Sequence, residues 1–369
     1  MKKITLLFAL ILWTGLSSFS QVNTALHFDG TSGLNGSAMS GQLVYTTPMI
    51  PFSTTFTVMG WVNVAKSSNI FTWGSATSEK LVRIDCSNVG KLRLYNGSYG
   101  NFSSTAEIYV GWHHIAVSSD AGSVTLYVDG VAGGTGTVTT PSPAPIKTTM
   151  GTAFNSRYEG KCKGQIDELS VWNIALTETQ ILAYKDTPPV GTETGALAVY
   201  NFNPSGITPA GNNTGHTTLP SLTGNYPGTL FGFPLTGETG NWVEVPVAVL
   251  PTGSGTSGDP YLIATIHNLF WLTQNSASWG SYFQQTVDID AFGTAVWNDN
   301  AGLTHIGNST TSFTGTYDGD GHAISNLRNY VNKGAYHGFF GRLTGATIKN
   351  LGLIMEIYLG ALTLGFWRA

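Results

Sequence analysis

The segment from Gly111 to Gly130, GWHHIAVSSDAGSVTLYVDG, places the strongest constraint on the fold. Apolar and polar residues alternate on both sides of Asp120–Gly122, and such a short glycine-containing connection is typical of a β-hairpin. Val124, Leu126 and Val128 share one face of the second strand, as in a half-buried sheet. The segment therefore predicts antiparallel strands that bury one face against another layer.

Shorter runs with the same alternation occur before the hairpin. They lie at residues 26–28, 58–62 and 92–94, and each is bounded by glycine, serine or asparagine. Strand character returns after position 195. We therefore expect an all-β first domain, an antiparallel sandwich over residues 21–245.

One helix interrupts the strand pattern. Thr177, followed three residues later by Gln180, forms a capping-box sequence ahead of Ile181 and its apolar neighbours. Pro188 and Pro189 prevent a longer helix. A short helix is predicted directly after Thr177.

Composition limits the classes of partner. Only 10% of the residues are charged and the formal net charge is -4. No basic stripe is available to neutralise phosphates, which argues against nucleic acid as a partner. The 46 glycines indicate many turns between short strands rather than long helices.

The first 20 residues have the pattern of a secretory signal peptide. Lys2 and Lys3 precede an apolar run over residues 4–16, and Ser18-Phe19-Ser20 supplies small residues before a cleavage point near Gln21. A membrane anchor is the alternative, but the run is shorter than the roughly 20 residues that span a bilayer. We expect a secreted or cell-surface protein with no membrane span in the mature chain.

The pattern changes after position 245. Residues 246–260 contain prolines and the run GSGTSGDP, which is typical of a linker. Within residues 261–353, positions 266–273 fit a short helix, and the tetrapeptide at 324–327 recurs in related form at 348–351. Such recurrence predicts the start of a β-solenoid, a short parallel β-helix. Residues 354–369 do not continue it, and we interpret them as a truncated or frameshifted end.

The sequence contains two cysteines, Cys86 and Cys162. An exported chain enters an oxidising compartment, so this pair can close a disulfide. Two separate thiols are the alternative, because sequence cannot show whether the two Cα atoms come within about 7 Å.

Three separated motifs resemble the laminin G-like, concanavalin A-like lectin/glucanase superfamily. They are ALHFDG near the start, GWHHIAVSSDAGSVTLYVDG in the middle, and GQIDELSVWNIALTETQI further on, and the resemblance covers Val22 to Glu244. It implies a jelly roll of two sheets with a short helix at its margin. Downstream, FTGTYDGDGHAISNL and GFFGRLTGATIKNLGL look like GLUG-type repeats of bacterial surface proteins, which implies a parallel β-helix.

The glucanases of this superfamily carry a Glu-x-Asp-x-x-Glu pattern, since retaining hydrolysis needs two carboxylates about 5 Å apart. That pattern is missing from this sequence. Asp167 and Glu168 are adjacent, and neighbouring side chains of a strand point to opposite faces. The resemblance also implies a structural calcium ion, whose carboxylate ligands would be Asp29 and Asp167; a turn at Asp29 and a solvated Asp167 are the alternative.

Flat rings are common in sugar-binding surfaces, and 12% of the residues are aromatic. We expect ligand contacts at aromatic residues in or near loops, namely Trp73, Tyr95, Tyr99 and Tyr158. The sequence thus favours a secreted, noncatalytic recognition or adhesion protein that binds a glycan or a protein ligand. A glycoside hydrolase of the same fold and a purely structural spacer or gene fragment are the alternatives.

Overall fold

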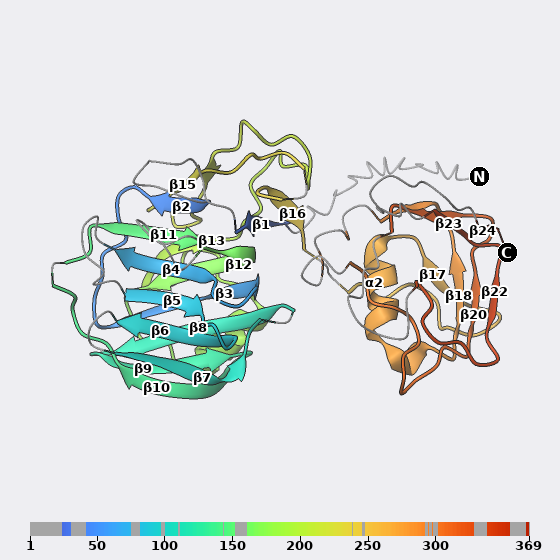
Figure 1. The fold of residues 1–369 in the computed structure, drawn as a ribbon, viewed down its shortest axis with the longest axis horizontal. Coiled ribbons are helices and arrows are strands. Elements are labelled where there is room, and N and C mark those ends of the chain that lie inside the picture. The colour runs from blue at the N-terminus through green and yellow to red at the C-terminus, as the bar shows by residue number, and fades with distance from the viewer. Residues whose placement is uncertain are drawn as a thin grey trace, which may run out of the picture.

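The chain forms two regions, each with its own hydrophobic core (Figure 1). The first core consists of residues between Leu26 and Trp242, and most of the second lies between Ile263 and Leu351. The computed structural model describes residues 24–30, 42–74, 82–96, 100–109, 111–142, 144–151, 161–237, 239–245, 248–291, 294, 297, 302–327, 338–354 and 367–368.

The first region is a sandwich of two largely antiparallel sheets, sheet A and sheet B. In order, sheet A contains β10 (Val131–Thr137), β9 (Ser123–Val128), β8 (His113–Asp120), β3 (Phe56–Val64), β12 (Lys163–Trp172), β1 (Thr24–Asp29) and β16 (Trp242–Glu244), with β13 (Ala196–Tyr200) also paired to β12. Sheet B contains β14 (Thr218–Leu219), β15 (Gly228–Phe231), β2 (Leu43–Thr46), β11 (Lys147–Gly151), β4 (Asn69–Gly74), β5 (Val82–Cys86), β6 (Lys91–Asn96) and β7 (Asn101–Glu107). The expected all-β, mostly antiparallel sandwich is confirmed.

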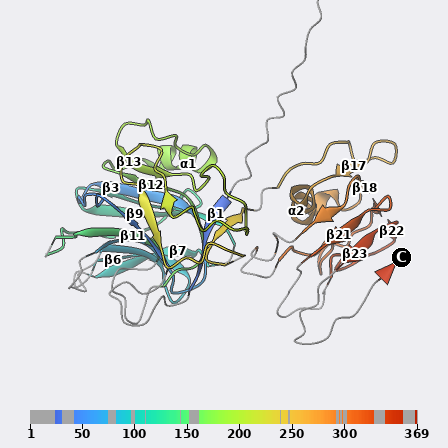
Figure 2. The ribbon, with the colours of Figure 1, turned by 90° about the horizontal axis from the view of Figure 1, so that it is seen from above.

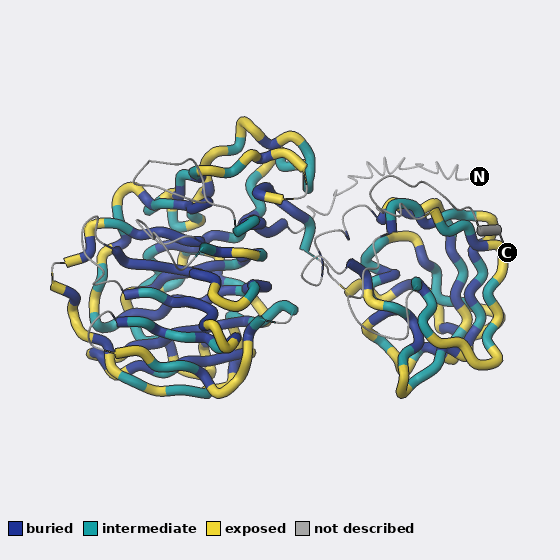
Figure 3. The backbone as a smooth tube through the Cα atoms, viewed as in Figure 1, coloured by how far each residue is buried: buried dark blue, intermediate teal, exposed yellow. Residues whose placement is uncertain are grey.

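The hairpin predicted from the sequence consists of β8 and β9. Asp120 pairs with Ser123, so the connection has two residues, Ala121 and Gly122, both in the left-handed backbone region. A two-residue turn of this kind matches the twist of the strands that it joins. Val124, Leu126 and Val128 of this face belong to the core between the sheets. Figure 3 shows buried stretches, in dark blue, along the strands of this region.

The predicted helix is α1 (Glu178–Asp186), and its capping box is present as expected. The Thr177 hydroxyl accepts a hydrogen bond from the Gln180 backbone N–H, and the Gln180 side chain accepts one from the Thr177 N–H. Tyr184 stacks on Trp172 of β12, with ring centroids 5.1 Å apart. The helix therefore lies against the outer face of sheet A (Figure 2).

Both cysteines are buried and carry free thiols, so the predicted disulfide is wrong. Each side chain lies in the core of the sandwich, where a thiol packs as a small apolar group. Burial raises the pKa of Cys86 to about 12 and raises that of Cys162 as well. Neither sulfur is therefore a thiolate at neutral pH.

The second region contains two sheets whose strands run mainly parallel, sheets C and D. Sheet C contains β17 (Tyr261–Ile263), β18 (Tyr282–Gln285), β20 (Thr316–Asp318) and β22 (Thr347–Lys349), and sheet D contains β19 (Ile289–Asp290), β21 (Ala323–Ser325), β23 (Gly352–Ile354) and β24 (Trp367–Arg368). Only β24 is antiparallel to its partner. The predicted helix is α2 (Ile266–Gln274), which begins after a capping box at Thr265.

The repeated tetrapeptide does not mark equivalent strands. Ile324 belongs to β21 and pairs with Leu353, whereas Ile348 belongs to β22 and pairs with Tyr317. The two copies instead share a local shape, because Asn326 and Asn350 both adopt a left-handed conformation after a short strand. Asparagine tolerates this conformation better than most residues. The recurrence therefore reflects the need for a left-handed residue after each short strand.

Residues 248–260 are more ordered than their linker-like composition suggests. The Val249 N–H donates to the His267 carbonyl, and the Asn268 amide donates to the Val249 carbonyl. Ser254 and Asp259 close a tight turn through backbone hydrogen bonds. The segment is thus tied to the second region by its backbone.

The two regions meet at β16. Ala25 and Val243 are buried in the hydrophobic cluster of the second region, and Glu244 forms an ion pair of 2.9 Å with His267 of α2. Within the described residues, no helix combines the length and the apolar character that crossing a membrane requires.

Candidate ligand-binding face

A continuous row of side chains crosses sheet B from β15 to β7. Strand register aligns one residue from each of seven neighbouring strands, in the order Thr229, Tyr45, Thr149, Thr72, Arg83, Tyr95 and Asn101. All seven are polar or aromatic, whereas the residues on either side of Thr72 and of Arg83 belong to the core. We call this row and the residues that bond to it the sheet B face.

Strand alternation explains why these side chains point outward. Phe71 and Trp73 lie in the core, so Thr72 between them faces away from sheet A. The same holds for Thr149, whose neighbour Met150 is a core residue, and for Arg83, which lies between Val82 and Ile84. The periodicity that builds the core therefore also builds the sheet B face.

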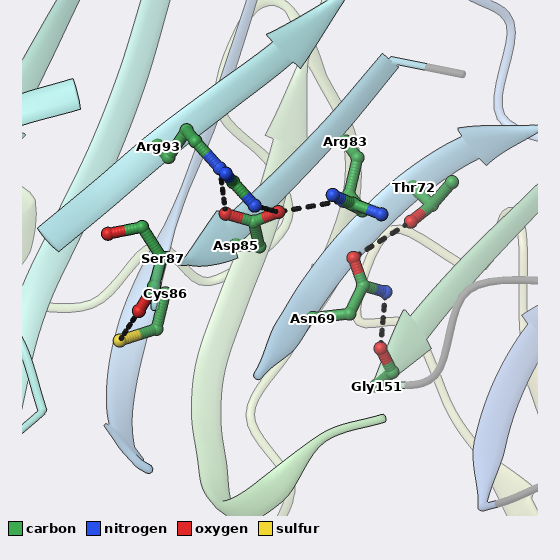
Figure 4. A network of polar contacts seen from close by, with 8 residues as sticks. All are labelled: Asn69, Thr72, Arg83, Asp85, Cys86, Ser87, Arg93 and Gly151. Atoms are coloured by element: carbon green, nitrogen blue, oxygen red, sulfur yellow. Dashed lines mark hydrogen bonds and ion pairs between the residues drawn. The ribbon is translucent and has the colours of Figure 1, made fainter. Parts of the chain in front are cut away.

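A charged cluster lies at the centre of this face (Figure 4). Asp85 accepts a hydrogen bond of 2.7 Å from Arg83 Nε, and further bonds of 2.8 and 2.9 Å from Arg93 Nε and Nη2. The Asp85 side chain is 4% exposed, and those of Arg83 and Arg93 are 12% and 22% exposed. A carboxylate shared by two guanidinium groups fixes both arginines in one geometry.

Two further contacts hold the neighbouring side chains in place. The Arg83 guanidinium lies over the Tyr95 ring, 4.9 Å from its centroid, which is a cation–π contact. On the other side, the Thr72 hydroxyl donates to Asn69 Oδ1, and the Asn69 amide donates to the Gly151 carbonyl (Figure 4). The face is therefore rigid before any ligand arrives.

Thr149 is the exception in this bonded network. It is 1% exposed, and its hydroxyl Oγ1 is buried without a hydrogen-bond partner among the described residues. A buried hydroxyl that lacks a partner costs free energy, and an ordered water commonly satisfies such a group. Thr149 thus supplies a hydrogen-bonding group that the described protein does not itself satisfy.

The four predicted ligand-binding residues have different outcomes. Trp73 is wrong as a ligand contact, because its side chain is 1% exposed and its indole N–H donates to the Ile50 carbonyl inside the core. Tyr95 lies in β6 on the sheet B face and stays a candidate. Tyr99 and Tyr158 lie outside the described residues.

Sequence reasoning missed the charged centre of the face. The segments 82–86 and 91–95 read VRIDC and KLRLY, in which every second residue is charged or polar between apolar ones. That alternation identifies the outward-facing residues, but only strand pairing shows that Arg83, Asp85 and Arg93 meet.

The predicted calcium ligands are not adjacent in the strand pairing. Asp29 pairs with Lys163, and Asp167 lies four residues further along β12, about 13 Å away along the strand. Asp167 is buried, and its Oδ1 accepts from the Glu168 N–H. The described residues contain no cluster of three or more His, Cys, Asp or Glu side chains suited to a metal. Calcium binding stays a prediction.

His113 and His114 have structural contacts. His113 Nδ1 lies 2.8 Å from Asp129 Oδ2, and the His114 N–H donates to the other oxygen of Asp129. Burial lowers the pKa of His114 to about 4. A neutral, buried imidazole of this kind is poorly suited to act as a general base near neutral pH.

Glu168 lies at a β-bulge, where β12 has one more residue than β3. Its φ angle is 51°, and Gly60 on β3 makes room for the bulge, because a Cβ at Gly60 would come within 2.9 Å of Leu169 Cα. Burial raises the pKa of Glu168 to about 7. The alternation that separates Asp167 from Glu168 in a regular strand is therefore broken here.

The pKa of Glu168 predicts a pH-dependent stability. Between its ordinary pKa of 4.5 and about 7, folded Glu168 keeps a proton that the unfolded chain loses, so the free energy of unfolding falls as pH rises through this window. After allowance for partial exposure we expect a loss of about 1.5 kcal/mol. Urea unfolding at pH 5 and pH 8 should show this loss in the natural chain but not in Glu168→Gln. An equal loss in both proteins would contradict the assignment to Glu168.

Two histidines give the stability of the natural chain the opposite dependence on pH. Burial lowers the pKa of His27 to about 4, as it does that of His114. Both contributions to stability are present above pH 6.5 and are lost as pH falls toward 4. The contribution of Glu168 is therefore the difference in the free energy of unfolding between the natural chain and Glu168→Gln at each pH.

Comparison with known proteins gives one family match. Residues 36–182, less than half of the chain, match the model of the concanavalin A-like lectin/glucanases superfamily. A segment of 108 residues is 38% identical to halomucin from Haloquadratum walsbyi and covers 28% of this chain. The chain spans about 1% of the length of halomucin.

Two solved structures are similar at low sequence identity. One is a Bacteroides ovatus protein provisionally assigned to carbohydrate binding, with a TM-score of 0.41, 18% identity, and coverage of 57% of this chain and 59% of that one. The other is a SAP-like pentraxin from Limulus polyphemus, with a TM-score of 0.35, 20% identity, and coverage of 44% and 81%. Residues 36–182 are therefore similar to domains of the concanavalin A-like lectin/glucanases superfamily.

Proposed function

We propose that the sandwich is a noncatalytic carbohydrate-binding domain and that the sheet B face contacts the sugar. The observation that carries this proposal is the row of polar and aromatic side chains across sheet B, in which Tyr45, Arg83 and Tyr95 are partly exposed. Sugars present many hydroxyl groups that donate and accept hydrogen bonds. Arg83 supplies hydrogen-bond donors, and Tyr45 and Tyr95 supply flat rings on the same row.

The charges on the face favour binding over hydrolysis. A retaining glycosidase needs two carboxyl groups about 5 Å apart, one of which holds a proton. Asp85 is the carboxylate of the central cluster, and both of its oxygens accept hydrogen bonds from arginines. Asp167 and Glu168 belong to the other sheet, and Asp167 is buried.

We also propose that the second region acts as a stalk in a secreted or cell-surface adhesion protein. Its parallel pairing aligns Phe283 with Tyr317, and these rings stack with centroids 6.4 Å apart. Stacked aromatic rungs of this kind fit the first turns of a parallel β-helix. Export itself depends on residues 1–20, which lie outside the described residues.

A glycan array probed with the full chain tests the proposal. The array is run once with calcium and once with EDTA, so that a role for calcium appears as a difference between the two. Binding to at least one glycan class is expected. Absence of binding to any glycan in both conditions would overturn the proposal, and release of reducing sugar would favour the glycoside hydrolase.

Two substitutions locate the binding surface. Tyr45→Ala and Tyr95→Ala should each weaken binding to the array ligand by about tenfold, which corresponds to about 1.4 kcal/mol. Each substitution removes a ring from the row, and the Tyr95 ring also lies beside Arg83. Tyr282→Ala, at an exposed tyrosine of the second region, is the matched control. Equal effects from the variants and the control would move the binding site elsewhere.

A further inference from the structure

We propose that Asn212 and Asn308 are attachment sites for N-linked oligosaccharides. The inference goes beyond glycan binding, and it rests on the export that is part of the proposed function, because N-linked sugars are carried by exported proteins. It depends on the sequence around each asparagine, on the exposure of the two loops, and on the hydrogen bonds within each turn.

Both residues begin an Asn-x-Ser/Thr sequence, which is the acceptor motif for N-linked sugars. The two segments read Asn-Asn-Thr at 212–214 and Asn-Ser-Thr at 308–310. Motifs this short also arise by chance, so the structural context decides which of them can react. An acceptor must lie in a surface loop with its amide nitrogen free to be approached.

The turn at position 308 meets this requirement. Asn308 Oδ1 accepts hydrogen bonds of 3.0 and 2.7 Å from the Thr310 backbone N–H and hydroxyl, and one of 2.8 Å from the Thr311 N–H. Asn308 Nδ2 has no hydrogen-bond partner among the described residues. Arg342 Nη1 donates to the Ser309 carbonyl at 2.9 Å and holds the loop in place.

The turn at position 212 has the same hydroxyl contact. Asn212 Oδ1 accepts from the Thr214 N–H at 3.3 Å and from the Thr214 hydroxyl at 2.9 Å. The middle residue, Asn213, is buried, and its amide donates to the Thr208 carbonyl and to Asn241 Oδ1. Asn212 and Thr214 are exposed on either side of it. A buried anchor therefore keeps the acceptor and its hydroxyl partner at the surface.

This geometry suits the chemistry of transfer. An amide nitrogen is a weak nucleophile, because its lone pair is delocalised into the carbonyl group. Donors to that carbonyl polarise the amide, so its N–H protons are removed more easily. Nδ2 then attacks C1 of an oligosaccharide linked to a polyprenyl diphosphate. The N–C1 bond forms, the C1–O bond breaks, the diphosphate leaves with the bonding electrons, and a base of the oligosaccharyltransferase takes one amide proton.

The chain contains three further acceptor sequences, which begin at Asn35, Asn96 and Asn101. Asn96 is 2% exposed, and its amide nitrogen is buried. Asn101 is exposed but belongs to β7, whose backbone is paired with β6 and cannot turn into an enzyme. Asn35 lies outside the described residues. Asn96 and Asn101 are thus internal comparisons for the two turns.

The first experiment treats the folded full chain with a purified oligosaccharyltransferase and a polyprenyl-diphosphate-linked oligosaccharide. Peptide mass spectrometry reads the occupancy of each asparagine. Asn212 and Asn308 should be modified, whereas Asn96 and Asn101 should not. A proteolytic digest of the chain, treated in the same way, should be modified at all four residues, which shows that the enzyme accepts each sequence.

Substitutions connect the transfer to the hydroxyl of each turn. Thr310→Val and Thr214→Val keep the side-chain shape but lose the hydroxyl, and each should abolish modification of its own asparagine and leave the other unchanged. Thr310→Ser should retain modification of Asn308. Thr311→Val keeps the backbone N–H that bonds to Asn308 and is the matched control. Circular dichroism verifies that each variant is folded.

The second experiment uses the chain purified from the cells that make it. N-glycosidase in heavy-oxygen water converts an occupied asparagine into labelled aspartate, and we expect label at Asn212 and Asn308. An exported chain without label at either residue, or a folded chain that reacts at neither while its digest reacts, would overturn the inference. An empty glycan array with labelled asparagines would instead overturn glycan binding and leave this inference standing. A chain found only inside the cell would overturn both this inference and the proposed secretion.

Discussion

Trp73→Ala is expected to lower the free energy of unfolding of the sandwich by about 3–5 kcal/mol, the usual cost of deleting a buried tryptophan ring. Trp73 is 1% exposed and packs edge-on against Phe52, Phe56 and Phe71, with ring centroids 4.7–5.2 Å apart. Its indole N–H also bonds to the Ile50 carbonyl. The substitution leaves a cavity and removes one of the two hydrogen bonds to the Ile50 carbonyl, which the Thr148 hydroxyl also donates to.

Urea unfolding measures this loss when it is followed by hydrogen–deuterium exchange of the backbone amides in β3, β4 and β12. Exchange in these strands separates the sandwich transition from that of the second region, which a single spectroscopic signal would merge. Trp73→Phe keeps most of the apolar volume and should lose roughly half as much. A loss below about 1 kcal/mol in Trp73→Ala would show that the side chain is not in the core.

Asp85→Ala is expected to destabilise the sandwich by about 3 kcal/mol, because it leaves two arginines without their shared partner. Removal of one member of a buried ion pair costs about 3–5 kcal/mol, and the partial exposure of Arg83 and Arg93 places this case at the lower end. The same substitution should also weaken glycan binding, since Arg83 is no longer held in place. Exchange in β5 and β6 together with the array measures both effects.

Two variants test this reasoning for Asp85. Asp85→Asn keeps hydrogen-bond acceptance and should lose about half as much stability. The triple variant Asp85→Leu, Arg83→Met, Arg93→Met replaces the charges with apolar groups, and it should recover most of the stability of the natural chain. A triple variant as unstable as Asp85→Ala would mean that the arginine charges are not the cause.

Trp73→Ala and Asp85→Ala should differ in their effect on glycan binding when both proteins are folded. Trp73 faces the core and Asp85 faces the sheet B face. At low urea, where both proteins are still folded, Trp73→Ala should retain affinity for the array ligand, whereas Asp85→Ala should not. Stability and recognition are therefore separable in this sandwich.

Local sequence was enough to predict several elements. The β8–β9 hairpin follows from strict alternation around a two-residue turn, and α1 follows from the Thr177–Gln180 capping box. Both depend on interactions between residues a few positions apart. The antiparallel sandwich also follows, because apolar residues at every second position need a facing layer.

Other assignments failed where the fold brings distant residues together. Trp73 looked like a loop residue beside a glycine, but β4 continues through it and its pairing with Thr148 turns the ring inward. The sequence left a disulfide and two separate thiols as alternatives for the two cysteines, and both are free in the structure. The repeated tetrapeptide at 324–327 and 348–351 indicated one strand position, yet its copies lie in different sheets.

The amino-acid sequence alone determined that the chain alternates between an apolar and a polar side, since that property is carried by neighbouring residues. Tertiary structure decided which polar residues meet. Arg83, Asp85 and Arg93 form a cluster only because β5 and β6 pair in one register, and Thr149 joins their face only through β4. A shift of one residue would send each of these side chains to the other side of the sheet, so the binding face is a property of strand pairing.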